Sequence, residues 1–158
     1  MSGALPASRG ALHLVTDERV PFDRLCDLVD VAAGAGADVV QLRAKSVTAR
    51  ELLRQAVALS EVVDRRSLLV IDDRVDVALA ARDAGARIDG VHLGQSDLPP
   101  ETARRLLGTH AVIGWTANTP AHLAAASALP PRTIDYLGVG VIRPTFTKPD
   151  HPPVLGID

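Results

Sequence analysis

The sequence predicts an α/β protein of the (βα)8 TIM-barrel type. Short runs of β-branched and other apolar residues alternate along the 158 residues with longer amphipathic segments, which is the pattern of repeated βα units and a parallel sheet. Polar residues collect just after nearly every predicted strand, as in barrel enzymes, whose active sites are built from these loops. An open doubly wound sheet also has alternating units, but its glycine-rich fingerprint is absent after the first strand. The barrel is therefore favoured.

The predicted strands recur about every 25 residues, which is the length of one βα unit. They are expected at residues 12–16, 39–42, 68–71, 90–93, 112–114 and 136–139. Eight such units need roughly 200 residues, so residues 1–158 are expected to form a single barrel domain that lacks the last two units. Because an open sheet leaves two unpaired strand edges, we expect the sequence to be part of a longer protein.

Start and stop signals mark the helices between these strands. A Thr followed three positions later by Glu forms a capping box, proline is tolerated in a first turn, and glycine ends helices in a left-handed conformation. The sequence carries the capping box Thr48 with Glu51, which opens a helix to about residue 64, the starts at Pro99 with Pro100 and at Thr119 with Pro120, and the stops at Gly34 and Gly36.

Composition argues against several classes of protein. The formal net charge of -2 and the 3% of aromatic residues disfavour a nucleic-acid-binding protein, which needs a basic face and usually stacking rings. No apolar run approaches the roughly 18 residues of a membrane-spanning helix, and the start of the chain lacks the build of a secretory signal. We therefore expect a cytoplasmic protein without membrane or nucleic-acid partners; a homo-oligomer is compatible with the sequence. Cys26, the single cysteine, is predicted to be a small buried hydrophobic residue.

Two acidic residues are candidate metal ligands. Asp73 and Asp97 follow the third and fourth predicted strands, which would be neighbours about 4.8 Å apart in a parallel sheet. Two carboxylates at that separation suit Mg²⁺, which takes oxygen ligands and keeps several waters for a phosphate-bearing substrate. The alternative is that both residues are helix N-caps or solvated loop acids.

Three cations are predicted to meet the same loops. Arg43 and Lys45 follow the second strand, and Lys148 follows the sixth. Together they would neutralise a diphosphate beside a metal ion, with Arg binding it bidentately and Lys acting as a point charge. Gln41 ends an apolar strand, where its amide could recognise a heterocycle or bond to neighbouring backbone. His92 lies within an apolar run and is interpreted as a hydrogen-bonded core histidine, and His13 is interpreted in the same way.

An ordered set of motifs resembles the thiamine phosphate synthase family over nearly the whole chain. The motifs are Leu-Val-Thr-Asp (14–17), Gln-Leu-Arg-x-Lys (41–45), Asp-Asp-Arg (72–74), Gly-Val-His-Leu-Gly-Gln-x-Asp (90–97), Ile-Gly-x-Thr (113–116), Asp-Tyr-Leu-Gly-Val-Gly (135–140) and Pro-Thr-x-Thr-Lys (144–148). The segments at 90–97 and 144–148 are the specific ones. The resemblance implies a (βα)8 transferase of thiamine biosynthesis that joins hydroxymethylpyrimidine diphosphate to a thiazole phosphate and releases diphosphate.

The resemblance also implies roles for individual residues. The pyrimidine diphosphate would be bound by Gln41, Leu42, Arg43, Ala44, Lys45 and Asp72. Asp73 and Asp97 would hold Mg²⁺, and Thr116 would lie near the pyrimidine or its diphosphate. The thiazole substrate would meet Thr145, Phe146 and Thr147. Lys148, Arg43 and Lys45 would act catalytically by absorbing the charge of the leaving diphosphate, and no protein nucleophile is required.

Three positions depart from the family pattern. This chain has Asp72 where the family usually has Asn, Thr116 where it has Ser, and Asn118 where it has His. Asp72 places a negative charge beside an anionic substrate, whereas Thr116 keeps the hydroxyl. Two alternatives stay open: a non-catalytic or truncated ligand-binding relative, and the related thiazole tautomerase. The tautomerase is disfavoured, because it typically lacks the 90–97 segment and uses a histidine at position 118.

Overall fold

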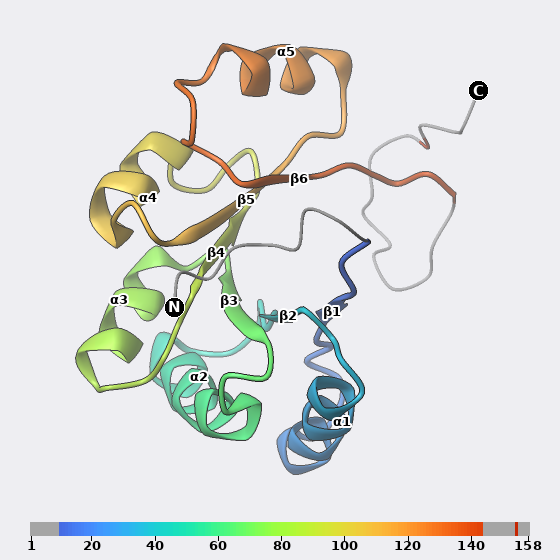
Figure 1. Ribbon diagram of the computed structural model, residues 1–158, viewed down its shortest axis with the longest axis vertical. Helices are drawn as coiled ribbons and strands as arrows, with labels where there is room; N and C mark the ends of the chain where they lie inside the picture. The colour runs from blue at the N-terminus through green and yellow to red at the C-terminus, as the bar shows by residue number, and fades with distance from the viewer. Residues whose placement is uncertain (1–9, 144–153, 155–158) are drawn as a thin grey trace.

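A computed structural model describes residues 10–143 and Val154, and these form a parallel six-stranded sheet with helices along its outer side (Figure 1). Each strand pairs in parallel with the next in chain order. The strands are β1 (His13–Val15), β2 (Val39–Leu42), β3 (Leu68–Asp72), β4 (Gly90–Leu93), β5 (Val112–Thr116) and β6 (Tyr136–Gly138). The arrangement is TIM-barrel-like, and within the described residues the sheet is open, with β1 and β6 at its edges.

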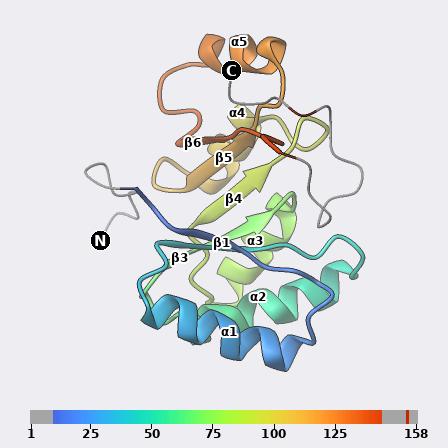
Figure 2. The ribbon, with the colours of Figure 1, turned by 90° about the vertical axis from the view of Figure 1, so that its right-hand side faces the viewer.

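One helix follows each of the first five strands, as right-handed βα units require. The helices are α1 (Phe22–Gly34), α2 (Ala49–Val63), α3 (Val75–Asp83), α4 (Pro100–Leu107) and α5 (Pro120–Ala128). Successive helices α1 to α4 contact one another along the outside of the sheet. Figure 2 shows α1 and α2 side by side against the first strands. In the described part of the chain, no helix is long and apolar enough to cross a membrane.

The two faces of the sheet have different cores because side chains alternate along each strand. Val40 and Leu42 of β2 point outward and are fully buried in the large core beneath the helices. Val39, by contrast, packs with Val70 and Val112 in a small apolar layer on the inner face. Gln41 is on the same face as Val39, one step closer to the carboxyl end of the strand. The inner face is therefore apolar at its base and polar above it.

The predicted strands are confirmed: β2 and β4 have the predicted bounds, and the others differ by one or two residues. The predicted start of α2 is also confirmed, because the Thr48 hydroxyl accepts a hydrogen bond from the backbone N–H of Glu51 at 3.3 Å. The Glu51 carboxylate, however, binds Arg54 and Gln55 instead of completing the capping box. Helices α4 and α5 begin at Pro100 and Pro120, as predicted.

The prediction for the end of the first helix is only half right. Gly36 has a φ of +96° and supplies the left-handed residue that follows the cap. Gly34, in contrast, is the last residue of α1, and Ala35 caps the helix with a φ of -83°. A single left-handed residue just beyond the cap suffices to turn the chain. Cys26 of α1 is half-buried and packs against the outer core, so it is less enclosed than predicted.

An aspartate that precedes each even-numbered strand closes the base of the sheet. Through Oδ2, each of these aspartates accepts a hydrogen bond from a backbone N–H at the start of the preceding strand. The pairs are Asp38 with Leu12 at 2.9 Å, Asp89 with Leu69 at 2.8 Å and Asp135 with Ile113 at 2.7 Å. Each also donates its own backbone N–H to the carbonyl of the same partner residue. The repeated ring of two hydrogen bonds sets the register at which neighbouring strands begin to pair.

Replacing one of these carboxylates should destabilise the fold. Asp89→Ala leaves the half-buried N–H of Leu69 without its acceptor, which we expect to lower the free energy of unfolding by about 1–3 kcal/mol. Asp89→Asn keeps an acceptor oxygen and should cost less. Urea denaturation measures both, with Asp27→Ala as the control, because the Asp27 side chain is 69% exposed and only pairs loosely with Arg24. An Asp89→Ala protein as stable as the control variant would contradict the prediction.

Candidate active site

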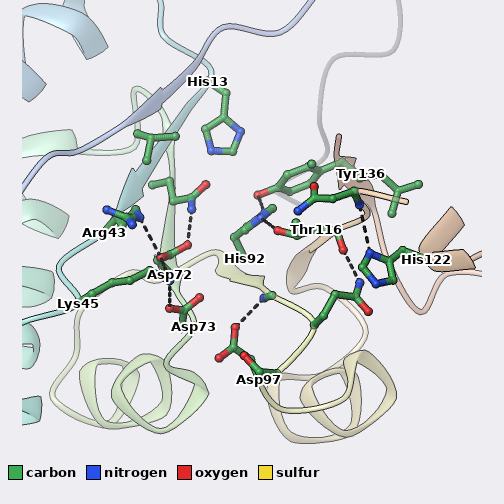
Figure 3. A pocket seen from close by; sticks show the side chains of 18 residues that line it. His13, Arg43, Lys45, Asp72, Asp73, His92, Asp97, Thr116, His122 and Tyr136 are labelled. Atoms are coloured by element: carbon green, nitrogen blue, oxygen red, sulfur yellow. Dashed lines mark hydrogen bonds and ion pairs between the residues drawn. The ribbon is translucent and has the colours of Figure 1, made fainter. Parts of the chain in front are cut away.

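A cavity of about 710 Å³ opens at the carboxyl ends of the strands (Figure 3). This is the end of the sheet at which barrel enzymes carry their active sites. All six strands or the loops that follow them contribute to its wall. The lining residues are His13, Val15, Gln41, Arg43, Lys45, Asp72, Asp73, His92, Gly94, Gln95, Ser96, Asp97, Thr116, Asn118, His122, Tyr136, Leu137 and Gly138.

Asp72 is the centre of a charged cluster on one wall. Its side chain accepts a hydrogen bond from Gln41 Nε2 at 2.5 Å. Its other oxygen lies 3.6 Å from Arg43 Nε and 3.9 Å from Lys45 Nζ. Burial, joined by the like charge of Asp73, raises the pKa of Asp72 to about 6, although Lys45, Arg43 and Gln41 oppose the rise. Asp72 therefore pairs with two cationic side chains, Arg43 and Lys45, that could otherwise bind an anionic ligand.

Asp73 reaches the cavity through an unusual backbone turn. Its φ is +62°, a conformation that Asp tolerates better than most residues. The N–H of Arg74 donates to the carbonyl of Asp72 at 2.7 Å, which closes a three-residue turn around Asp73. The carboxylate then pairs with Lys45 Nζ at 2.9 Å. Burial alone would lower the pKa of Lys45, but the Asp73 bond together with the negative charges of Asp73 and Asp72 raises it.

Asp97 faces Asp73 from the loop after β4. Its Oδ2 accepts the backbone N–H of Gly94 at 2.6 Å, which fixes the turn of the loop. Burial raises the pKa of Asp97; the Gly94 bond opposes this, and the Asp73 carboxyl adds to it both as a hydrogen-bond partner and as a like charge. Neither acid is a helix N-cap, because those positions belong to Arg74 and Pro99. The capping alternative is therefore excluded for both.

Imidazole, hydroxyl and amide groups that hydrogen-bond to one another form the opposite wall. His92 contacts the Tyr136 hydroxyl through Nδ1 at 3.0 Å and the Thr116 hydroxyl through Nε2 at 2.9 Å. Gln95 Nε2 donates to the backbone carbonyl of Thr116. The His92 ring is thus hydrogen-bonded, as the sequence predicts, but it lines the cavity instead of lying in an apolar core.

Two further histidines complete the wall. His13 of β1 stacks edge to face with Tyr136, with ring centroids 5.5 Å apart. Burial lowers the pKa of His13, and the interaction with the Gln41 side chain opposes this lowering. His122, in the first turn of α5, accepts the backbone N–H of Asn118 through Nδ1 at 3.3 Å.

The structure gathers most of the sequence-predicted site residues at this cavity: Gln41, Arg43, Lys45, Asp72, Asp73, Asp97 and Thr116. Gln41 binds the Asp72 side chain, not the neighbouring backbone that was its alternative. Leu42 and Ala44 do not line the cavity, because strand alternation turns them toward the outer core. The remaining predicted residues, Thr145, Phe146, Thr147 and Lys148, lie outside the described residues.

Sequence reasoning missed Tyr136, Gln95 and His122 as residues of the site. Tyr136 carries a usable signal, since it opens a strand in which positions 136 and 138 share a face. His122 gives none, because its place depends on how α5 packs. Within residues 10–143, no group of three or more His, Cys, Asp or Glu side chains forms a ready-made metal site, so the two carboxylates are the only described acids that the metal prediction rests on.

Comparison with known proteins gives a consistent family. The family model described as "Thiamine monophosphate synthase" matches residues 12–158. A protein of Corynebacterium efficiens named thiamine-phosphate synthase is 41% identical over 136 residues, which are 86% of this chain and 62% of the relative. A protein of Albidiferax ferrireducens with the same name is 45% identical over 149 residues, 93% of this chain and 64% of the relative. A thiamine biosynthetic bifunctional enzyme of Saccharomyces cerevisiae is 36% identical over 141 residues, 87% of this chain and 25% of the relative.

A solved structure supports the fold. The structure titled "PhdJ bound to substrate intermediate" superposes with a TM-score of 0.58 over 81% of this chain and 51% of its own, at 15% sequence identity. At that identity it supports the arrangement of strands and helices alone. The chain spans less than two thirds of the length of the two bacterial relatives. The family match over residues 12–158 and the identities over most of the chain show that this protein belongs to the thiamine monophosphate synthase family.

Proposed function

We propose that this protein acts as a thiamine-phosphate synthase, built on a complete (βα)8 barrel. The reaction joins the methylene carbon of hydroxymethylpyrimidine diphosphate to the ring nitrogen of a thiazole phosphate. The bond between that carbon and the diphosphate oxygen breaks, and its electron pair leaves with diphosphate. The thiazole nitrogen then donates its own pair to the carbon. No protein nucleophile and no protein-bound intermediate are needed.

The observation that carries the proposal is the meeting of two cations and two acids in one cavity. Arg43 and Lys45 extend from the end of β2, and Asp73 and Asp97 face one another across the next two strands (Figure 3). Cations in a half-buried site stabilise the negative charge that develops on a departing diphosphate. Arg43 and Lys45 are therefore proposed to bind this group and to promote its departure.

Gln41 is proposed to orient the pyrimidine. Its Nε2 donates to the buried Asp72 carboxylate at 2.5 Å, which fixes the direction of the amide. The amide oxygen is an acceptor: the interaction with His13, which raises the pKa of that histidine, uses one of its two lone pairs, and the other is available to a ligand. An amino group on a pyrimidine is a matching donor.

Asp73 and Asp97 fit a Mg²⁺ ion by the chemistry of their donors. Both supply carboxylate oxygens, and they lie close enough that the Asp73 carboxyl adds to burial in raising the pKa of Asp97. Such an ion, when bound, would supply positive charge to the leaving diphosphate. The proposed role of the two aspartates is to hold the ion beside Lys45.

A reconstitution assay tests the proposal. The purified protein is incubated with hydroxymethylpyrimidine diphosphate, thiazole phosphate and Mg²⁺, and thiamine phosphate and released diphosphate are measured in parallel. Equal amounts of the two products, formed only when both substrates are present, are the expected result. Binding of the pyrimidine diphosphate without any product would instead support the ligand-binding alternative.

Asp72→Asn should improve binding of the pyrimidine diphosphate. The amide can still accept the Gln41 bond, but it no longer pairs with Arg43 and Lys45, which lie 3.6 and 3.9 Å from the carboxylate. We expect the KM for this substrate to fall about 3- to 10-fold, corresponding to about 1 kcal/mol of released ion pairing. Steady-state kinetics measure it, with Asp30→Asn as a control, because Asp30 pairs with Arg66 away from the cavity. A higher KM would show that the aspartate is a favourable ligand.

A further inference from the structure

We infer that Tyr136 and His92 are positioning residues that hold the Thr116 hydroxyl as a hydrogen-bond donor toward the cavity. The three side chains come from neighbouring strands β4, β5 and β6, with the His92 ring between the two hydroxyls (Figure 3). The inference rests on the proposed function for its kinetic consequence only, since the hydrogen-bond pattern can be measured without turnover.

Two glycines confine the His92 ring between its partners. A Cβ on Gly114 would lie 2.2 Å from Tyr136 Cζ and 2.5 Å from His92 Nδ1. A Cβ on Gly138 would lie 2.9 Å from His92 Cε1. Because these positions of β5 and β6 carry no side chain, they leave space in which the two rings pack. The rings fill this space, so the distances at both nitrogens are set by the sheet.

The chemistry of the partners selects one tautomer of His92. A phenol is a stronger donor and a weaker acceptor than an aliphatic hydroxyl, and an unprotonated imidazole nitrogen is a strong acceptor. Burial, with the charges of Asp72 and Asp135, raises the pKa of Tyr136, so its hydroxyl keeps its proton. The favourable pattern therefore runs from the Tyr136 hydroxyl to Nδ1. The ring proton is then on Nε2, which donates to Thr116 Oγ1.

This pattern decides what Thr116 can offer a ligand. Its oxygen accepts from His92, so its own proton points away from the imidazole. The backbone carbonyl of Thr116 already accepts from Gln95, and its β-branched side chain has few rotamers. Because Thr116 lines the cavity, the hydroxyl donates to an acceptor atom of the bound substrate. Gln41 on the opposite wall offers an acceptor, so one wall presents a hydrogen-bond donor to the ligand and the other presents an acceptor.

The first test is nitrogen-15 NMR of the histidine ring. In the unmodified protein, His92 Nδ1 should give the shift of an unprotonated nitrogen and Nε2 that of a protonated one. Tyr136→Phe removes only the hydroxyl oxygen, and a substantial fraction of His92 should then carry its proton on Nδ1. Ser127→Ala, which removes a hydroxyl on α5 that donates to Leu123, is the control and should leave both shifts unchanged. A proton on Nδ1 of His92 in the unmodified protein would overturn the inference.

The second test is a double-mutant cycle on kcat/KM of the synthase reaction. Tyr136→Phe should reduce it about 10-fold, and Thr116→Val should reduce it further. In the Thr116→Val background, Tyr136→Phe should have little added effect, because the hydroxyl that it positions is gone. Thr116→Ser should recover much of the loss seen with valine. Independent, multiplying effects would mean that Tyr136 acts by packing alone and would overturn the inference. Absence of turnover in the unmodified protein would count against the proposed function, and the NMR result would still decide the inference.

Discussion

Asp97→Asn is expected to lower the proposed synthase activity about 100-fold or more while the protein keeps its fold. The substitution removes one of two carboxylates that face each other in the cavity, and thereby weakens the proposed Mg²⁺ site. The fold should survive, because the amide oxygen can still accept the Gly94 N–H that Asp97 accepts at 2.6 Å. Loss of one like charge beside Asp73 also relieves repulsion.

Two measurements separate a metal effect from a general one. Mn²⁺ binding, followed by its electron paramagnetic resonance signal, should weaken in Asp97→Asn even without substrates. Asp76→Asn is the control, since Asp76 is an acid in the first turn of α3 that pairs with Arg74 and does not line the cavity. It should bind Mn²⁺ and turn over like the unmodified protein. Unchanged activity in Asp97→Asn, or full activity without any divalent cation, would contradict the proposed metal site.

Much of the fold could be predicted because its signals are local. The apolar runs at 39–42 and 90–93 coincide with β2 and β4, since four consecutive buried or half-buried positions leave little freedom in where a strand begins. Alternation within those runs also predicts that Gln41 and Arg43 share a face, and both line the cavity. Asp73 and Asp97 could be predicted to lie close together, because each follows one of two strands that are neighbours in the sheet.

The rest of the site depends on long-range register. His92 is opposite Gly114 in the β4–β5 pair, and Gly114 is opposite Tyr136 in the β5–β6 pair. Only this register places a ring from β4 between hydroxyls of β5 and β6, and a single sequence does not reveal it. The left-handed backbone of Asp73 is equally hidden, because Asp at the end of a strand is compatible with several turns. Local patterns thus predict which elements carry the site, whereas pairing decides which side chains meet.

Gly90→Ala is expected to be the most destabilising small substitution in the sheet. Gly90 begins β4 and pairs with Val70 and Val112. A Cβ at this position would lie 1.7 Å from the backbone oxygen of Val112 and 2.6 Å from its carbonyl carbon. The neighbour is backbone, and it is held in place because the N–H of Val112 donates to the carbonyl of Asp89 at 2.9 Å. Relief of the clash requires the β4–β5 pairing to open.

We expect Gly90→Ala to lower the free energy of unfolding by about 3 kcal/mol or more, measured by urea denaturation and by the soluble yield. Gly10→Ala is the control, because none of the described residues lies within 4 Å of a Cβ there. Gly114→Ala provides a contrast: its clashing atoms belong to the side chains of Tyr136 and His92, which can turn aside. Gly114→Ala should therefore lose activity with a smaller loss of stability. If Gly90→Ala is as stable as the control, the β4–β5 pair can separate at little cost. The close approach of these two strands would then not be what fixes the positions of His92 and Thr116.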